Sequence, residues 1–170
     1  MSSVVHTIGG MPVTTRLAMK MEDSLQAFAV RAACFIGELD VPFFKRAQLT
    51  AADLSLALGA KGRGAFRDLN RLTIFADHLV PHVLRIDGVL AYGPGLAARI
   101  DREDLITPGS PEEVEIRAAA VHAVELMRES LARHGLSVTS MGLDYVLWNR
   151  GQQRHYKTIK PRHRARTVYY

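Results

Sequence analysis

Apolar side chains recur along this chain at intervals of three and four residues, the repeat that places them on one face of an α-helix. One such stripe predicts a helix over residues 22–39 and consists of Leu25, Phe28, Ala32, Phe35 and Leu39. A second stripe predicts a helix over residues 42–58, with Pro42 in its first turn and Gly59 just past its end. That second stripe consists of Phe44, Ala47, Ala51, Leu54 and Leu58.

A third helix is predicted over residues 65–80, where Pro81 ends or kinks it. Its apolar arc consists of Phe66, Leu69, Leu72, Phe75, Ala76 and Leu79. At 100° per residue, Asp77 lies about 20° from the first member of this arc, and Thr73 and Asn70 precede it on the same side. A carboxylate at the edge of a core is partly desolvated and fixed in direction, which suits catalysis. The alternative is an acid at a helix end that bonds only its neighbours or solvent.

The strongest local signal is the sequence Ser110-Pro111-Glu112-Glu113, which is typical of a capping box. Ser110 is placed to accept a hydrogen bond from the amide of Glu113, and the Glu113 carboxylate to reach back to the amide of Ser110. This pattern predicts a helix that continues to about His134 and stops at Gly135. Shorter helices are predicted over residues 84–90, 96–100 and 143–148. We find no convincing pair of strands, so the predicted fold class is all-α.

Two charged pairs interrupt these apolar patterns. Glu113 and Arg117 are four residues apart on the apolar side of their helix, which predicts a partly buried ion pair. Such a pair more often braces a fold than takes part in chemistry, so we interpret it as structural. Lys45-Arg46 follows an apolar helix start, and its two cations either meet a phosphate or extend to water.

The composition is that of one soluble globular domain. The chain has 170 residues, of which 48% are hydrophobic and 23% charged. No apolar run reaches the length of a membrane span, and the N-terminus lacks the pattern of a signal peptide. Cys34 is the single cysteine, which excludes an internal disulfide and makes a reducing cytoplasm the expected location. We expect one helical domain over residues 1–170, with a poorly ordered N-terminus over residues 1–20.

The net charge of +5 is unevenly distributed. Residues 150–170 contain seven of the 22 basic residues and no acid, so the rest of the chain carries a net charge of −2. This basic C-terminal tail suits a phosphate, a nucleotide or a nucleic acid, and the alternative is a terminus that stays extended in solvent. His78 and His82 have a spacing that permits metal binding, but Pro81 separates them and no third ligand is evident. We therefore predict no metal site.

Several segments, taken in order, resemble the queuosine salvage family of N-ribosyl hydrolases. The first is Phe43-Phe44-Lys45-Arg46-Ala47-Gln48-Leu49 followed by Ala52-Asp53-Leu54, and the second is Leu72-Thr73-Ile74-Phe75-Ala76-Asp77 followed by Val80-Pro81. Gly88-Val89-Leu90 with Tyr92 and Leu96, and Gly109-Ser110 with Glu113-Val114-Glu115-Ile116-Arg117, continue the likeness. It ends with Asp144, Leu147 and Trp148, then Pro161-Arg162-His163-Arg164, Arg166-Thr167 and Tyr169-Tyr170.

The resemblance implies a fold like that of helical DNA glycosylases and the hydrolysis of queuosine 5′-monophosphate to queuine and ribose 5-phosphate. Queuine then serves tRNA modification, and no metal or organic cofactor is implied. The motif that contains Asp77 is the catalytic one, and Lys45 is our choice for the 5′-phosphate because it is a compact charge on a helix. The other residues that the resemblance implies in substrate binding are Phe75, Asp144, Trp148, His163 and Arg164.

Three departures from the family pattern keep two alternatives open. Family members are longer and carry an N-terminal helical half that helps to enclose the base. Asp77 is followed by His78-Leu79 in place of Tyr-Arg, and Arg162 replaces the tyrosine of a Pro-Tyr-His run. One alternative is a non-catalytic nucleotide- or nucleic-acid-binding module, which the basic tail favours. The other is a subunit whose base pocket is completed by another chain, either in a homo-oligomer or by an N-terminal partner.

Overall fold

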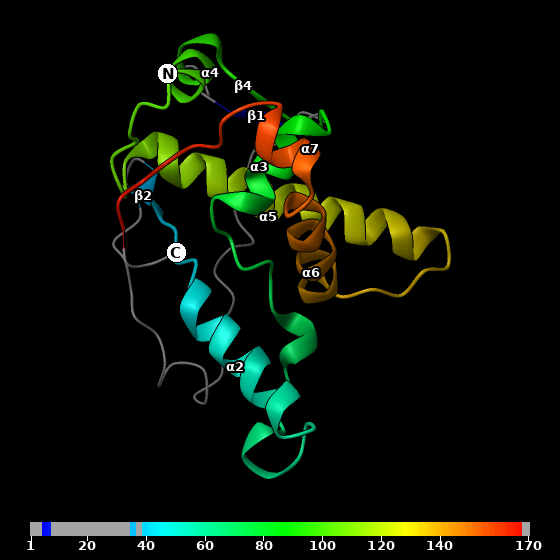
Figure 1. The fold of residues 1–170 in the computed structure, drawn as a ribbon. Helices are drawn as coiled ribbons and strands as arrows, with labels where there is room; N and C mark the ends of the chain where they lie inside the picture. Colours follow the sequence, from blue (N-terminus) through cyan, green and yellow to red (C-terminus); the bar gives the residue numbers. More distant parts are fainter. Residues whose placement is uncertain (1–4, 8–34, 37–38, 168–170) are drawn as a thin grey trace.

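The computed structural model describes residues 5–7, 35–36 and 39–167, and this part of the chain is mainly helical (Figure 1). The helices are α2 (Lys45–Ala57), α3 (Leu79–Ile86), α4 (Pro94–Asp101), α5 (Pro111–Arg133), α6 (Ser140–Gly151) and α7 (Arg154–Thr158). The all-α prediction is therefore confirmed for the described residues, while the likeness to helical DNA glycosylases stays a prediction. The expected helix over residues 22–39 and the N-terminal segment 1–20 lie largely outside the described residues.

Helix α5 runs through the centre of the core, with α3 and α6 packed against it (Figure 1). The expected stripe of Ile116, Ala120 and Val124 is buried, and Met127 packs against the same core while partly exposed. Residues 116–121 are all buried, so neighbours enclose this stretch on every side. The helix accommodates such close neighbours because most of these side chains are small.

Gly151, the last residue of α6, packs tightly against α3. A Cβ atom at this position would lie 2.8 Å from Cγ of Leu79 and 3.0 Å from Cγ2 of Val83. Any larger residue would therefore force these two side chains to shift. This contact fixes the end of α6, from which α7 and the tail continue.

Capping at the start of α5 follows the sequence prediction with one change of partner. Oγ of Ser110 accepts a hydrogen bond from the amide of Glu113 at 3.4 Å. The Glu113 carboxylate reaches back one residue further than expected and accepts from the amide of Gly109 at 3.2 Å. The helix ends at Arg133, and Gly135 follows with a φ of 80°, the left-handed conformation that glycine adopts without strain.

The predicted third helix over residues 65–80 is wrong. The structure has two short 3₁₀ turns, η1 (Gly62–Gly64) and η2 (Leu69–Arg71), then an irregular segment, and α3 begins only at Leu79. Backbone groups of residues 73, 75 and 76 pair with side chains of distant elements, which replaces the hydrogen bonds that a helix would have made. Pro81 is the third residue of α3, where its missing N–H removes no helical hydrogen bond.

Helix α2 also begins later than predicted, at Lys45 and not at Pro42. Phe44 precedes it with a φ of 47°, a left-handed conformation, so the apolar run before the helix is not helical. The helical hydrogen bonds then begin with the amide of Gln48, which donates to the carbonyl of Phe44 at 3.0 Å. This late start leaves Lys45 in the first position of the helix.

Two short antiparallel strand pairs, which the sequence analysis did not predict, accompany the helices. β1 (Val5–Thr7) pairs with β4 (Leu90–Tyr92), and β2 (Phe35–Ile36) pairs with β3 (Leu39–Asp40). The predicted helix over residues 22–39 is therefore wrong for residues 35, 36 and 39, and the predicted helix over residues 84–90 is wrong beyond Ile86, because α3 ends there and Leu90 begins β4. No sheet among the described residues has more than two strands, so the fold class remains all-α.

The described part of the basic tail, residues 150–167, folds back onto the body of the protein and does not extend into solvent. After α7, the carbonyl of Arg164 accepts a hydrogen bond from the amide of Ile106 at 2.8 Å, and Leu105 forms a parallel bridge with Arg164. His163, the preceding residue, is only 2% exposed. A segment rich in cations is thus placed beside α3 and the loop after α4.

Candidate active site

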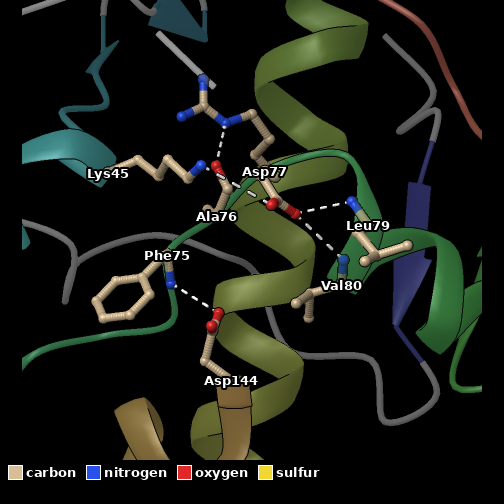
Figure 2. A network of polar contacts seen from close by, with 8 residues as sticks. Lys45, Phe75, Ala76, Asp77, Leu79, Val80 and Asp144 are labelled. Carbon is tan, nitrogen blue, oxygen red and sulfur yellow. Dashed lines mark hydrogen bonds and ion pairs between the residues drawn. The ribbon is translucent and has the colours of Figure 1, made fainter. Parts of the chain in front are cut away.

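Asp77 lies two residues before the start of α3, and its carboxylate accepts hydrogen bonds from the first backbone amides of that helix. Oδ1 accepts hydrogen bonds from the amides of Leu79 at 2.7 Å and Val80 at 3.3 Å (Figure 2). Oδ2 lies 3.9 Å from Nζ of Lys45, at the start of α2. The side chain is 9% exposed, so the negative charge is held in a nearly dry position by two amides, a helix N-terminus and one cation.

The predicted polar column on one helix is wrong, because residues 70, 73 and 77 do not share a helix. Asp77 is nevertheless buried, which confirms its expected place at the edge of the core. Thr73 is engaged elsewhere, since its amide donates to Oε1 of Gln48 at 2.9 Å. Gln48, which is 5% exposed, also donates to the carbonyl of Phe43 at 2.9 Å. Sequence reasoning missed this link, and its only signal was the position of Gln48 within the Lys45-Arg46-Ala47-Gln48 motif.

A buried ion pair fixes the backbone next to Asp77. Nη1 of Arg117 donates to Oε1 of Glu113 at 3.2 Å, and the two side chains are 4% and 2% exposed. Nε of Arg117 donates to the carbonyl of Ala76 at 2.8 Å, and its Cζ lies 3.9 Å from the ring centre of Phe43. The pair is therefore connected to the residue that directly precedes Asp77. Because the guanidinium of Arg117 binds the Ala76 carbonyl, the ion pair is suited to hold the backbone beside Asp77 in place.

Asp144 approaches the same segment from α6. Its Oδ1 accepts from the amide of Phe75 at 2.9 Å (Figure 2), and the residue is 6% exposed. Burial raises the pKa of Asp144 to about 6, and the nearby charge of Asp77 acts in the same direction, while the Phe75 amide and Lys45 oppose it. The site therefore contains two carboxyl groups in different settings, one against a cation and a helix N-terminus and one that gains a proton at mildly acidic pH.

Phe75 and Trp148 are the two aromatic residues that the resemblance implies in substrate binding. Phe75 packs with Phe66, Leu69 and Met141 around Ala51 and Leu72 in a small apolar cluster. Trp148 is one helical turn after Asp144 on α6 and is 43% exposed. An exposed indole beside a buried carboxyl group is a surface on which a base can stack.

His163 and Arg164 lie on the returning tail. With His78 they line a cavity of about 470 Å³ that also includes Arg162, Arg166 and Thr167. Burial, together with the nearby charges of His78 and Arg117, lowers the pKa of His163 to about 3. Arg164 is exposed and pairs with Glu103, with 2.7 Å between its Nη1 and Oε2 of the acid. His78 directly follows Asp77 in the chain, but Asp77 itself is not part of the cavity lining.

Within residues 5–7, 35–36 and 39–167, no group of three or more histidine, cysteine or acidic residues is arranged to hold a metal ion. In the same part of the chain, no helix combines the length and apolar character needed to cross a membrane. Nε2 of His82 is 2.6 Å from the carbonyl of Tyr156, and this contact joins α3 to α7. The residues that could hold a ligand near Asp77 are therefore carboxylates, cations and aromatic rings.

Comparison with known proteins identifies a family and several relatives of this chain. Residues 14–170 match a family described as queuosine salvage protein. A queuosine 5′-phosphate N-glycosylase/hydrolase from Sphaerobacter thermophilus is 46% identical over 138 residues, which are 81% of this chain and 42% of that relative. Proteins of the same name from Dictyostelium discoideum and Mus musculus are 39% and 34% identical, over 75% and 76% of this chain.

These alignments cover 40% of the Dictyostelium relative and 41% of the mouse relative, so the chain spans less than half the length of the relatives it matches. The match nevertheless extends across Lys45, Asp77, the α5 ion pair, Asp144 and the tail. A family match of this extent, together with relatives 31% to 46% identical, is not a chance likeness. The chain belongs to the queuosine salvage protein family.

Proposed function

We propose that this protein hydrolyses the N-glycosidic bond of queuosine 5′-monophosphate and releases queuine for the salvage of queuosine in tRNA. The names of the relatives support this reaction. One observation of the structure supports its assignment to particular residues. Asp77 is a buried carboxylate fixed by the amides of Leu79 and Val80, with Lys45 as its cation. A fixed negative charge in a nearly dry site is what departure of a base from ribose requires.

The reaction places its charge on the sugar. As the bond between C1′ and the base nitrogen breaks, the ribose becomes oxocarbenium-like, and a carboxylate nearby stabilises that positive charge and orients water. Queuine is a 7-deazaguanine with carbon at position 7, so protonation of N7, a common route for purines, is closed. Stabilisation of the positive charge on the sugar must therefore contribute more to lowering the activation barrier. We assign this role to Asp77.

The remaining residues are assigned to substrate binding. Lys45 receives the 5′-phosphate, since its ammonium group lies at the carboxylate and its helix holds it in place. Asp144, neutral or ionised near its raised pKa, binds the polar edge of the base, and Phe75 and Trp148 supply aromatic surface. His163 and Arg164 contribute from the tail to the cavity beside His78. We propose a cytoplasmic setting, in line with the single cysteine.

The test is release of queuine from queuosine 5′-monophosphate, measured by chromatography. Asp77→Asn retains an oxygen that accepts from Leu79 and Val80 but removes the charge, so turnover is expected to fall by roughly a hundredfold or more with little change in substrate binding. Asp104→Asn, an identical change at an exposed ion pair, is the control and should leave turnover unchanged. Undiminished release by a well-folded Asp77→Asn protein would exclude Asp77 from the mechanism.

A second candidate function is non-catalytic nucleotide or nucleic-acid binding on the same scaffold. The observation that favours it is the excess of exposed cations in the tail. If the unmutated chain binds the nucleotide but releases no queuine, this second function is favoured. Restoration of release at high protein concentration would instead support a homo-oligomer whose second copy completes the base pocket.

A further inference from the structure

A second cavity lies at the junction of α3, the end of α6, α7 and the tail. Its volume is about 370 Å³, near the lower end of the range for small-molecule sites. Its walls include Leu79, His82, Gly151 and Tyr156, and its lining contains none of Lys45, Asp77, Asp144 and Trp148. It shares Glu103, Arg162 and Arg164 with the cavity beside His78, so the two are neighbours along the tail.

The charges around this cavity are strongly unbalanced. Lys157, Lys160 and Arg162 line it and are exposed, and no acid among the described residues forms an ion pair with any of them. The one carboxylate in the lining, Glu103, is already paired with Arg164 at 2.7 Å. Three positive charges therefore remain uncompensated around one hollow, and each of them gains free energy from an anion bound between them.

The walls of the cavity are held in place before any ligand arrives. His82 fixes the backbone of α7 through its 2.6 Å contact with the Tyr156 carbonyl. The Tyr156 hydroxyl donates to Oδ1 of Asp87 at 2.7 Å, and Oδ2 of Asp87 lies 3.1 Å from Nε of Arg150. The close contact at Gly151 sets the separation of α3 and α6. A preformed cavity loses less entropy on binding than a mobile surface does.

From these observations we propose that this cavity is a second anion site, which adjoins the cavity beside His78 at Arg162 and Arg164 but contains neither Lys45 nor Asp77, and which binds a small organic phosphate monoester. A phosphate monoester carries between one and two negative charges near neutral pH and three acceptor oxygens, which suits the three cations of the lining. The volume exceeds that of a phosphate group, and Leu79, Gly151 and Pro161 offer apolar surface to an attached carbon chain or ring.

Glycerol 3-phosphate is a suitable probe, since it is a phosphate monoester without a base or a ribose ring. Binding is followed by isothermal titration and by the backbone NMR signals of α7 and residues 159–167. We expect saturable binding at one site, weakened about tenfold by Lys157→Gln and about tenfold by Lys160→Gln, because these two residues line this cavity and not the one beside His78. Arg154→Gln is the matched control, because Arg154 is an exposed cation of the same tail that lines neither cavity. This control should bind as the unmutated protein does.

Two further measurements separate this site from the proposed active site and from a nucleic-acid surface. Lys45→Ala should leave binding of glycerol 3-phosphate unchanged, and its loss there would place the phosphate at Asp77 and overturn the proposal. A single-stranded RNA oligonucleotide should bind more weakly than the probe. Tight RNA binding that depends steeply on salt and falls equally in Arg154→Gln, Lys157→Gln and Lys160→Gln would overturn it in favour of a nucleic-acid surface. No binding of glycerol 3-phosphate at millimolar concentration would also refute it, whatever the outcome of the queuine assay.

Discussion

At the scale of single residues, the two carboxyl groups of the site differ because their partners differ. Asp77 accepts hydrogen bonds from two backbone amides and forms an ion pair with Lys45. Asp144 accepts a hydrogen bond from one backbone amide and lies near the negative charge of Asp77. Burial raises the pKa of Asp144, so its folded-state pKa of about 6 lies above its usual value of 3.8. A proton on Asp144 therefore favours the folded protein.

The pH dependence of stability follows from this shift. The stabilising contribution of Asp144 is complete below its unfolded pKa near 4 and is lost as the pH rises through about 6. Asp144→Asn retains an acceptor for the Phe75 amide and does not ionise, so its stability relative to the unmutated protein should rise by about 2 kcal/mol between pH 4 and pH 7. Urea unfolding of both proteins across this range measures the difference. A constant difference would mean that Asp144 titrates normally.

Lys45 provides a second prediction at this scale. Its ammonium group lies at the Asp77 carboxylate, at the place we assign to the 5′-phosphate. Lys45→Ala should weaken binding of the nucleoside 5′-monophosphate by roughly tenfold or more, because a hydrogen bond between two charged groups is lost. Binding of the unphosphorylated nucleoside should change little.

Titration calorimetry with both ligands tests the assignment, and Lys61→Ala in the exposed loop after α2 is the control. Equal losses for nucleotide and nucleoside in Lys45→Ala would show that Lys45 has a structural role.

At the scale of elements, helices that carry their own start and stop signals were predictable. α5 begins at Ser110 and ends before Gly135, as its cap and its terminal glycine indicated. The segment from residue 65 to 80 was not, because its hydrogen-bond partners are Gln48, Arg117 and Asp144, which are remote in sequence. An apolar repeat indicates which side chains face the core. It does not indicate whether distant side chains form hydrogen bonds with the backbone of that segment in place of helical ones.

The same contrast explains how much of the candidate site was predictable. Asp77 and Lys45 were found from motifs and from patterns of burial. The route by which Arg117 acts on the Ala76 carbonyl was not, since no spacing along the chain relates α5 to the segment before α3. The cavities of the tail were missed for the same reason, because they form only where the tail meets Glu103.

The Ser110 cap gives a prediction for this scale. Ser110→Ala removes the acceptor of the Glu113 amide and should lower the free energy of unfolding by about 1 kcal/mol. Ser130→Ala, the same substitution in the interior of the same helix, should change it by only a few tenths of a kcal/mol. Chemical denaturation of both variants measures the two values. Equal effects would mean that the cap at Ser110 adds nothing to helix stability.

At the scale of the whole molecule, the returning tail buries one histidine, His163, where it packs against the body of the protein. His163 is 2% exposed, and burial lowers its pKa to about 3, far below the usual value of 6.5. The folded protein therefore disfavours the protonated form. Stability from this group is complete above pH 6.5 and is lost progressively as the pH falls toward 3.

Acidification should accordingly loosen the tail. Between pH 7 and pH 5 the His163 contribution should fall by about 2 kcal/mol, and His163→Gln should lack this part of the pH dependence. Urea unfolding at both pH values measures the stability, and NMR titration of the imidazole reports protonation directly. An imidazole that titrates near pH 6.5 in the folded protein would contradict the buried placement of His163.

The attachment of Asp77 to main-chain amides has a consequence for how the sequence diverges. Leu79 and Val80 hold the carboxylate through their N–H groups, which are the same for every residue except proline. The side chains of positions 78 and 79 therefore take no part in orienting the carboxylate. We expect substitutions at these two positions, where the resemblance gave Tyr-Arg and this chain has His78-Leu79, to change the surroundings of Asp77 without moving its carboxylate.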